Sequence, residues 1–318
     1  MVKRVLLASP RGYCAGVERA VDTVERLLDL HGPPIYVRKQ IVHNAHVVRD
    51  LEERGAIFVE TETEVPEGAT VVLSAHGVAP SVYENASARK LKTIDATCPL
   101  VTKVHVEARR YAAGGYEIAL IGHEGHEEVV GTTGEAPDAI VLVQTVEDAE
   151  RVEFADPERV AYITQTTLSV DETSEIIAVL RRRFPQIRAP KRDDICYATS
   201  NRQWAVKDML EVVDLLLVIG SRNSSNSNRL VEVARAGGVR AHLIDDETDI
   251  EERWLEDVET VGITSGASAP EKLVERVCGW FQARGVDSIE PFQSVHEDVF
   301  FKLPVELRRE LALAHSQG

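Results

Sequence analysis

The sequence predicts an α/β protein built from three similar units, and three features indicate this class. Short β-branched and aliphatic runs alternate with longer amphipathic stretches along most of the 318 residues. The runs are continuously apolar, which is typical of parallel strands that helices cover on both faces. A pattern of one cysteine and two polar clusters also recurs three times, which indicates a repeated unit.

Nine of the apolar runs are predicted to be strands. They lie at residues 2–8, 57–59, 71–73, 118–121, 140–143, 160–163, 215–219, 241–244 and 261–264. Helical patterns lie between them. After Cys14, apolar residues recur at i, i+3 and i+4 until Gly32 and two prolines, so a helix is expected to end there. This alternation predicts parallel sheets with right-handed crossovers.

The repeated unit begins with a cysteine at a strand-to-helix junction. The three cysteines are Cys14, Cys98 and Cys196. A polar residue follows each of them 28 or 29 positions later, and these residues are His43, His126 and Ser224. A second polar cluster follows a later strand in each copy, at His76, Thr166 and Ser268. An S-x-x-E pattern near each second cluster predicts helix N-caps at Ser81, Ser169 and Ser268.

The repeat divides the chain into three predicted α/β domains and a tail. We place the domains at residues 1–96, 97–194 and 195–283, with a C-terminal tail at 284–318. Open α/β sheets bind ligands at the carboxyl ends of their strands. A pseudo-threefold arrangement would therefore bring one cysteine from each domain to a common point. Helix N-termini at that point would supply N–H groups for an anion.

Three converging thiolates could hold either of two kinds of metal centre. Structural zinc sites usually use closely spaced cysteine pairs, whereas these cysteines are 84 and 98 residues apart. Three cysteines also suit an iron–sulfur cluster, in which one iron would remain open to a substrate. Three unrelated buried thiols are the remaining alternative, and the shared junction position disfavours it. The fourth cysteine, Cys278, lies in a helical apolar pattern and is expected in the core.

The segment 221–228 reads Ser-Arg-Asn-Ser-Ser-Asn-Ser-Asn between a predicted strand and a helix. It is either a capped loop or a phosphate cradle of hydroxyl, amide and backbone donors. Three histidines at corresponding points of the repeat favour the cradle. Because Arg222 is its one fixed cation, we expect anion binding to need protonated histidines and to weaken above about pH 8.

A candidate proton donor lies in the segment 122–128, which holds two histidines and three glutamates. Glu128 is the expected proton donor, because a carboxyl group near an anion and away from water has a raised pKa. Thr166 or Thr167 is the expected hydroxyl neighbour. The charged turn 191–194 before Cys196 is expected to be a solvated loop.

Composition excludes several classes of function. The chain has 36 basic and 52 acidic residues and a net charge of −16, which argues against a broad nucleic-acid surface. It contains no apolar run long enough for a signal peptide or a membrane helix. Four scattered cysteines are too few for a disulfide framework, so we expect a reduced, cytoplasmic location.

At these residues the sequence resembles the 4-hydroxy-3-methylbut-2-enyl diphosphate reductase family. No single shared segment decides this, but together they are specific and cover nearly the whole chain in family order. The shared segments are 12–17, 42–44, 74–78, 95–103, 125–126, 164–169, 195–199, 223–226 and 266–270. Glu127 departs from the family, which commonly has proline there, and places a second acid beside Glu128.

The resemblance implies three α/β domains around a 4Fe–4S cluster held by Cys14, Cys98 and Cys196. It implies reductive removal of the hydroxyl group of (E)-4-hydroxy-3-methylbut-2-enyl diphosphate, which gives isopentenyl and dimethylallyl diphosphate in the last step of the non-mevalonate isoprenoid pathway. Glu128 would deliver protons, with His126 and Thr166 beside it. The implied substrate ligands are His43, His76, His126, Thr166, Ser224, Ser225, Asn226 and Ser268.

The resemblance also implies an electron donor such as ferredoxin or flavodoxin, with its NADPH-dependent reductase. An acidic carrier of this kind requires a local basic surface on this acidic chain. One alternative is chemistry like that of quinolinate synthase, which needs no reductant and acts on a carboxylate. Another is a metal-containing sensor of a diphosphate metabolite, in which Glu128→Gln would leave ligand binding intact.

Overall fold

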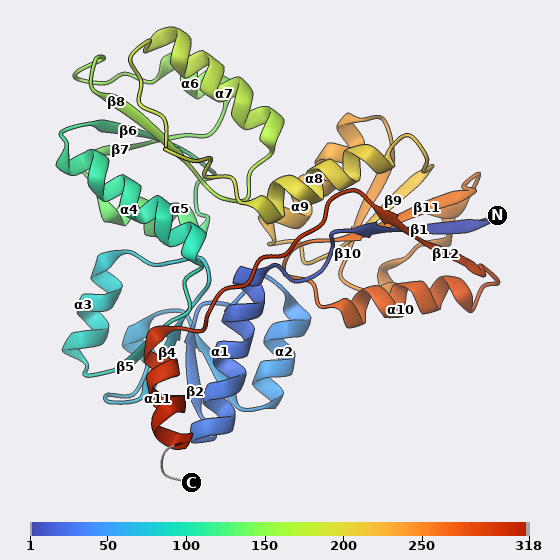
Figure 1. Ribbon diagram of the computed structural model, residues 1–318, viewed down its shortest axis with the longest axis horizontal. Helices are drawn as coiled ribbons and strands as arrows, with labels where there is room; N and C mark the ends of the chain where they lie inside the picture. Colours follow the sequence, from blue (N-terminus) through green and yellow to red (C-terminus); the bar gives the residue numbers. More distant parts are fainter. Residues whose placement is uncertain (1, 316–318) are drawn as a thin grey trace. The chain divides into compact units, whose positions relative to one another are not determined.

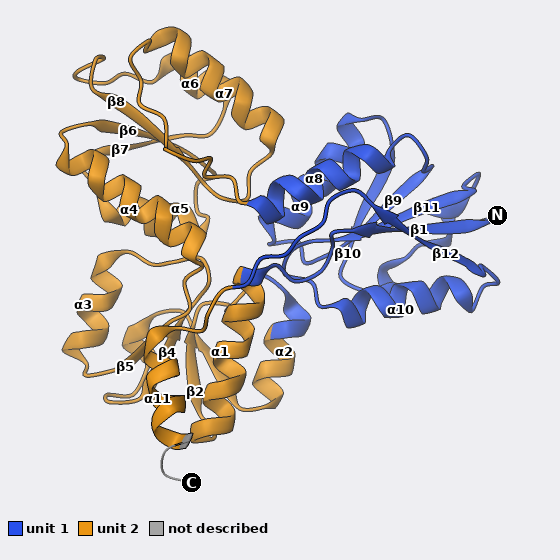
Figure 2. Ribbon diagram, in the orientation of Figure 1, with its two compact units in different colours: residues 1–15, 43–47, 197–300 blue, residues 16–42, 48–196, 301–318 orange. Residues whose placement is uncertain are grey.

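The computed structural model describes residues 2–315, an α/β chain with three parallel β-sheets (Figure 1). Residues 1 and 316–318 lie outside this described part. The chain divides into two compact units (Figure 2). The first unit contains residues up to 15, residues 43–47 and residues 197–300. The second contains residues 16–42, residues 48–196 and the chain from 301 onward. The predicted α/β class is confirmed.

The first unit contains a five-stranded sheet in the order β10-β9-β11-β1-β12. Its strands are β1 (Arg4–Ser9), β9 (Leu215–Ile219), β10 (Arg240–Ile244), β11 (Thr260–Ser265) and β12 (Ser288–Gln293). Its helices are α8 (Tyr197–Met209), α9 (Ser225–Ala236) and α10 (Glu271–Gln282), with short 3-10 turns at Glu247–Asp249 and Glu252–Leu255.

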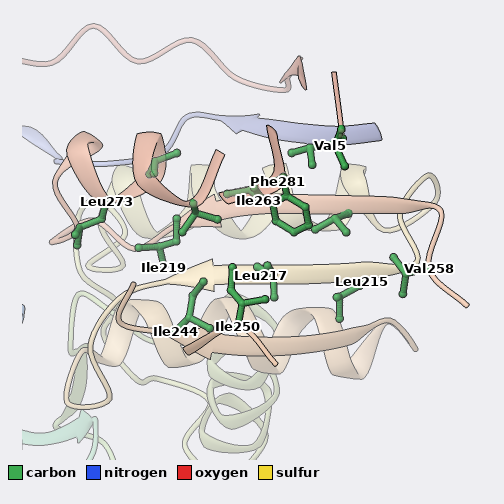
Figure 3. Close-up of a cluster of buried hydrophobic side chains, with 14 of the residues drawn as sticks. Val5, Leu215, Leu217, Ile219, Ile244, Ile250, Val258, Ile263, Leu273 and Phe281 are labelled. Carbon is green, nitrogen blue, oxygen red and sulfur yellow. The ribbon is translucent and has the colours of Figure 1, made fainter. Parts of the chain in front are cut away.

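Helices cover both faces of this sheet, as the continuous apolar runs predict. Leu215, Leu217 and Ile219 of β9 pack in one cluster with Leu273 and Phe281 of α10 (Figure 3). The intervening residues of β9 pack against α8 and α9 on the opposite face. Side chains alternate between the two faces of a strand, so a strand buried on both faces must be apolar throughout.

The second unit contains a four-stranded sheet in the order β3-β2-β4-β5 and a three-stranded sheet in the order β7-β6-β8. Their strands are β2 (Ile35–Arg38), β3 (Ala56–Val59), β4 (Thr70–Leu73), β5 (Lys92–Asp95), β6 (Glu117–Ile121), β7 (Ile140–Val143) and β8 (Val160–Thr164). The helices before residue 114 are α1 (Ala15–His31), α2 (Ala45–Glu53), α3 (Pro80–Ala88) and α4 (Pro99–Ala113), with a 3-10 turn at Glu62–Glu64. The others are α5 (Glu127–Glu135), α6 (Val146–Arg151), α7 (Val170–Arg183) and α11 (Val305–His315).

All nine predicted strands are present, and three further strands were missed. The strand β12 contains a proline and lies at the edge of its sheet, where a missing N–H is tolerated. Strand β5 is also an edge strand and has charged ends. Strand β2 follows two prolines that the sequence pattern used only to end a helix. The predicted helix after Cys14 is confirmed as α1, which ends at His31.

The strand β1 lies in the five-stranded sheet, paired with β11 and β12, and not with the strands of residues 35–95. The expected tail also contributes β12 to this sheet, while α11 contacts β5 in the second unit. The domain limits themselves at 96/97 and 194/195 remain a prediction.

Two of the three predicted N-caps are wrong. Helix α3 begins at Pro80 with Ala79 as its cap, because the fixed φ of proline suits the first helical position. Helix α10 has Pro270 as its cap, and the Ser268 hydroxyl has another partner. The third is confirmed, since the Ser169 hydroxyl accepts the N–H of Glu172 at 3.3 Å.

None of the helices in residues 2–315 combines the length and the apolar character that a transmembrane span requires.

The strands β9 and β11 each end at a glycine that a buried serine of α9 approaches closely. A Cβ atom would lie 2.1 Å from the Ser227 hydroxyl oxygen at Gly220, and 2.0 Å from it at Gly266. Both distances are well below van der Waals contact. The glycines therefore allow the first turn of α9 to pack directly on the ends of the two strands.

We predict that Gly266→Ala lowers the free energy of unfolding by about 2 kcal/mol, because the added methyl group displaces Ser227. The matched control is Gly279→Ala in α10, where no heavy atom lies within 4 Å of the new methyl group. That control should be neutral or stabilising by up to about 1 kcal/mol. Urea unfolding of both variants measures the difference, and equal effects would contradict the close-approach argument.

Candidate functional site

The three repeated cysteines occupy equivalent positions in the structure. Each directly precedes the first residue of a helix: α1, α4 or α8. The backbone N–H of each donates to a carbonyl oxygen two residues beyond the end of a strand. The three bonds join Cys14 to Ala267 at 3.2 Å, Cys98 to Ala75 at 3.0 Å and Cys196 to Thr166 at 3.0 Å. One cysteine is thus fixed to the strand ends of each sheet, although each bond partner lies outside the predicted domain that contains the cysteine.

These positions suit thiolate ligands. All three side chains are partly exposed, and no disulfide joins any of the four cysteines, which all lie in the described chain. A thiolate at a helix N-terminus is stabilised by the free N–H groups there. Cys278 differs, because it packs beside the core cluster of α10 and burial raises the pKa of its thiol. Cys278, expected in the core, is thus only partly buried at its edge, and the assignment of the other three cysteines to a metal site remains a prediction.

Glu128 lies in the first turn of α5 and is 2% exposed. Its two carboxylate oxygens accept the N–H of Thr166 at 2.6 Å and the hydroxyl of Thr166 at 3.0 Å. Burial raises the pKa of Glu128 to about 7, against the opposing effect of these two bonds. The expected carboxyl with a raised pKa and a threonine neighbour is present, and Thr166 is that neighbour.

His126 is the N-cap of α5, and its Nδ1 accepts the N–H of Glu128 at 3.2 Å. Burial, with a smaller contribution from His76, lowers the pKa of His126 to about 4. The ring is therefore neutral near pH 7 and carries its proton on Nε2, where it can donate to an anion. Desolvation thus argues against a protonated His126 as the anion ligand, and the expected weakening of anion binding above about pH 8 remains a prediction.

Glu127 and Glu128 are adjacent in the sequence but lie in different environments. A Glu127 oxygen lies 3.3 Å from Nδ1 of His76, whose ring meets that of His126 edge-on at 6.0 Å. Burial alone would raise the pKa of Glu127, but the hydrogen bond and charge of His76 lower it overall. Glu127 is thus ionised while Glu128 can hold a proton, which separates the roles of the two acids.

The first unit gathers the other predicted polar residues near the ends of β9 and β11. Ser224 caps α9 by accepting the N–H of Ser227 at 3.3 Å. Asn226 accepts the N–H of Ala267 at 2.9 Å. The Ser268 hydroxyl donates to the carbonyl oxygen of His43 at 2.9 Å.

Three more residues complete this group in the first unit. Asn223 lies 3.4 Å from Nδ1 of His43, and Ser225 is the first residue of α9. The Ser221 hydroxyl accepts the N–H of Ala45 at 3.1 Å, which ties residues 43–47 to the serine-rich turn. The turn 221–228 is thus a capped loop, and its cap leads into a helix N-terminus that is suited to an anion.

Sequence reasoning missed two buried residues of the second unit. Gln165 accepts the N–H of His123 and donates to the Thr167 hydroxyl, which joins the loops after β6 and β8. Asp194 was placed in a solvated loop, but it is buried and accepts from the Thr164 N–H and from Lys103. Because residues 191–193 are charged and exposed, the sequence pattern did not indicate that Asp194 is buried.

The repeated junction defines a class of three-sheet α/β proteins in which each sheet holds one cysteine at a helix start. Within that class, the chain belongs to the LytB protein family, whose model matches residues 5–282.

Relatives and solved structures agree with this assignment. The chain is 66% identical to a 4-hydroxy-3-methylbut-2-enyl diphosphate reductase of Acidothermus cellulolyticus, over 97% of this chain and 91% of that one. It is 61% identical to one of Mycolicibacterium paratuberculosis, over 96% and 92%. The E-1-hydroxy-2-methyl-but-2-enyl-4-diphosphate reductase structure of Plasmodium falciparum superimposes with a TM-score of 0.95 at 39% identity, covering 100% of this chain and 99% of that one.

A second solved structure is similar with a lower score. It is described as (E)-4-hydroxy-3-methyl-but-2-enyl diphosphate reductase, the terminal enzyme of the non-mevalonate pathway. Its TM-score is 0.63 at 32% identity, and the match covers 89% of this chain and 100% of that one.

The raised pKa of Glu128 predicts a pH-dependent loss of stability. The folded protein binds this proton more tightly than the unfolded chain, whose glutamate has the usual pKa of 4.5. The contribution to the free energy of unfolding is therefore complete below pH 4.5 and is lost as the pH rises through 7. Between pH 5 and 8 the wild type should lose about 2 kcal/mol relative to Glu128→Gln, measured by urea unfolding. Parallel pH profiles of the two proteins would contradict this.

Proposed function

We propose that the chain catalyses the reductive dehydroxylation of (E)-4-hydroxy-3-methylbut-2-enyl diphosphate to isopentenyl and dimethylallyl diphosphate, the last step of the non-mevalonate isoprenoid pathway. Family membership and the names of the relatives support this function. The structural observation that carries it is the buried, protonatable Glu128, whose two carboxylate oxygens are held by Thr166. One cysteine bonded to the strand ends of each sheet supports it.

The cofactor in this proposal is one 4Fe–4S cluster, held by Cys14, Cys98 and Cys196. Three thiolates at helix starts, none of them in a disulfide, suit iron and sulfide. When bound, the cluster would supply the electrons of the reduction and one iron without a protein ligand. Zinc remains less suitable, because the donor set within the described residues offers no closely spaced cysteine pair.

The diphosphate would be bound by neutral donors and helix N-termini. The second unit offers His76 and the Nε2–H of the neutral His126 at the start of α5. The first unit offers His43 and Ser268 together with the start of α9, at Ser224, Ser225 and Asn226. Oriented N–H groups at a helix start bind phosphate without fixed positive charge.

The reaction takes up two electrons and two protons, breaks the allylic C–O bond and releases water. Glu128 is the proposed proton donor, because its burial keeps it protonated at near-neutral pH. Thr166 fixes both of its oxygens and would also hydrogen-bond near the substrate hydroxyl. His126 would orient the substrate through its donor nitrogen.

The electron donor in this proposal is a ferredoxin or flavodoxin with its NADPH-dependent reductase. The segment 181–192 supports an acidic carrier, because it has six basic residues and no acidic one in a chain of net charge −16. Lys191 and Arg192 are exposed, and no carboxylate in the described chain pairs with them. The segment runs toward Cys196. Thiols that must stay reduced to hold a cluster also support the expected cytoplasmic location.

Protein purified without oxygen should contain about four iron and four sulfide per chain. It should convert the proposed substrate with reduced methyl viologen as electron source. Cys98→Ser should lose iron, sulfide and turnover together. Zinc near one per chain without sulfide would overturn the redox function.

Glu128→Gln separates the enzyme from a diphosphate sensor. This variant should keep its iron and its affinity for inorganic diphosphate but lose at least about 100-fold in kcat, because no proton can be delivered. Unchanged turnover would remove Glu128 from the proposed chemistry. For the wild type, kcat/KM should fall above about pH 7 as Glu128 ionises.

The donor surface is tested by charge reversal. Lys191→Glu with Arg192→Glu should raise KM for reduced ferredoxin or flavodoxin about tenfold at low salt, and less at high salt. Turnover with methyl viologen should change much less than turnover with the protein donor. Lys90→Glu with Lys92→Glu, an equal charge change elsewhere in the same unit, is the matched control. Equal effects of both pairs would exclude a specific docking surface.

A further inference from the structure

Each of the three helices that begin after a cysteine carries a cation that binds the loop of another cysteine. We call residues 10–14, 95–98 and 192–196 the cysteine loops. The cations are Arg19 of α1, Lys103 of α4 and Arg202 of α8. They lie five, five and six residues after Cys14, Cys98 and Cys196. This second repeat is independent of the polar clusters that first indicated the domains.

Arg19 binds the loop of Cys98. Its guanidinium donates to the carbonyl oxygen of Thr97 at 3.0 Å and to that of Asp95 at 3.3 Å. Thr97 directly precedes the cysteine. Burial lowers the pKa of Arg19, while the charges of Asp95 and Cys98 act in the opposite direction. The guanidinium thus lies close enough to Cys98 to act on it electrostatically.

Lys103 binds the loop of Cys196. Its ammonium group donates to the carbonyl oxygens of Arg192 at 2.6 Å and Asp193 at 2.9 Å, and to the buried carboxylate of Asp194 at 2.8 Å. A lysine has three N–H donors, and all three are used here on consecutive residues. The second oxygen of Asp194 accepts the N–H of Thr164 at the end of β8, so the loop is also fixed to its sheet.

Arg202 binds the loop of Cys14. It is completely buried and donates to the carbonyl oxygen of Gly12 at 2.8 Å. It also pairs with Glu297 at 3.0 Å, which provides the countercharge that a buried guanidinium requires. The N–H of Gly12 donates to the Ser265 hydroxyl at 2.8 Å, so the N–H and the carbonyl group of Gly12 are both hydrogen-bonded.

The order of these contacts is cyclic. The helix after the first cysteine holds the second loop, the helix after the second holds the third, and the helix after the third holds the first. Charge-assisted hydrogen bonds are about twice as strong as neutral ones, so each cation orders its loop more than a neutral donor would. Each also adds positive charge beside a position where a thiolate is proposed.

We propose that Arg19, Lys103 and Arg202 are positioning residues, each of which orders the loop of the next cysteine for binding the cluster. This proposal rests on the proposed function, because the cluster belongs to that function. Loss of one cation should leave the fold intact but free one loop and lower the reduction potential of the cluster, since the reduced state carries more negative charge.

Arg19 and Lys103 are the positions to test, because Arg202 is fully buried and its replacement would disturb the first unit as a whole. The variants are Arg19→Gln and Lys103→Gln, with Arg19→Lys and Lys103→Arg as charge-conserving partners. Arg26→Gln and Arg110→Gln are matched controls, since both remove an exposed, ion-paired arginine from the same two helices.

Two readouts besides turnover decide the outcome. Amide hydrogen exchange should become about tenfold faster in residues 94–100 of Arg19→Gln and in residues 190–198 of Lys103→Gln, as the loss of a charge-assisted hydrogen bond implies. Iron loss from the holoprotein to a chelator should accelerate by a similar factor, with a lower reduction potential. The charge-conserving variants should recover most of each effect, and the controls should match the wild type.

Unchanged exchange and unchanged iron loss in both glutamine variants would overturn the proposal. The same conclusion would follow if the charge-conserving variants behaved like the glutamine variants. Absence of iron from the wild type would instead overturn the proposed function, and amide exchange would still decide whether the cations order the loops.

Discussion

The hydrogen bond from each cysteine amide to a carbonyl just beyond a strand is the constraint on which the candidate site depends. It fixes each cysteine to the strand ends of one sheet, while the helix that follows starts the next part of the chain. A parallel sheet presents its loops at the carboxyl ends of its strands, so three sheets can each present one thiol in the same chemical setting. Without these bonds the cysteines would be exposed loop residues with no fixed direction.

Desolvation decides the chemistry of the acid and base residues. Glu127 and Glu128 are neighbours in the chain, yet contact with His76 keeps the first ionised and burial against Thr166 allows the second to keep its proton. His126 loses its charge for the same reason that Glu128 gains its proton. In the proposed function, this neutral histidine would bind the anion through an oriented N–H group, and the protonated Glu128 would supply the proton.

Much of the fold and site could be predicted from the sequence, because continuous apolar runs and repeated cysteines are strong local signals. The missed strands β5 and β12 are edge strands, which need less apolar character. The pairing of β1 with β11 and β12 could not be predicted, because pairing is not encoded in the run itself. The burial of Asp194 and the hydrogen-bond partners of Arg19 and Lys103 could not be predicted, because both depend on tertiary contacts. The charge state of His126 could not be predicted for the same reason.

The pairing of β1 also has a consequence for synthesis on the ribosome. This strand is made long before its neighbours β11 and β12, which follow it by more than 250 residues. The four-stranded and three-stranded sheets contain only residues 35–164, so they can form while the chain is still growing. The loop of Cys14 cannot adopt its final conformation until Ala267 has been made, because the amide of Cys14 is hydrogen-bonded to the carbonyl oxygen of Ala267. Of the three thiols, Cys14 is therefore the last to reach its final place, and the proposed cofactor would be inserted only after residue 267 has been made.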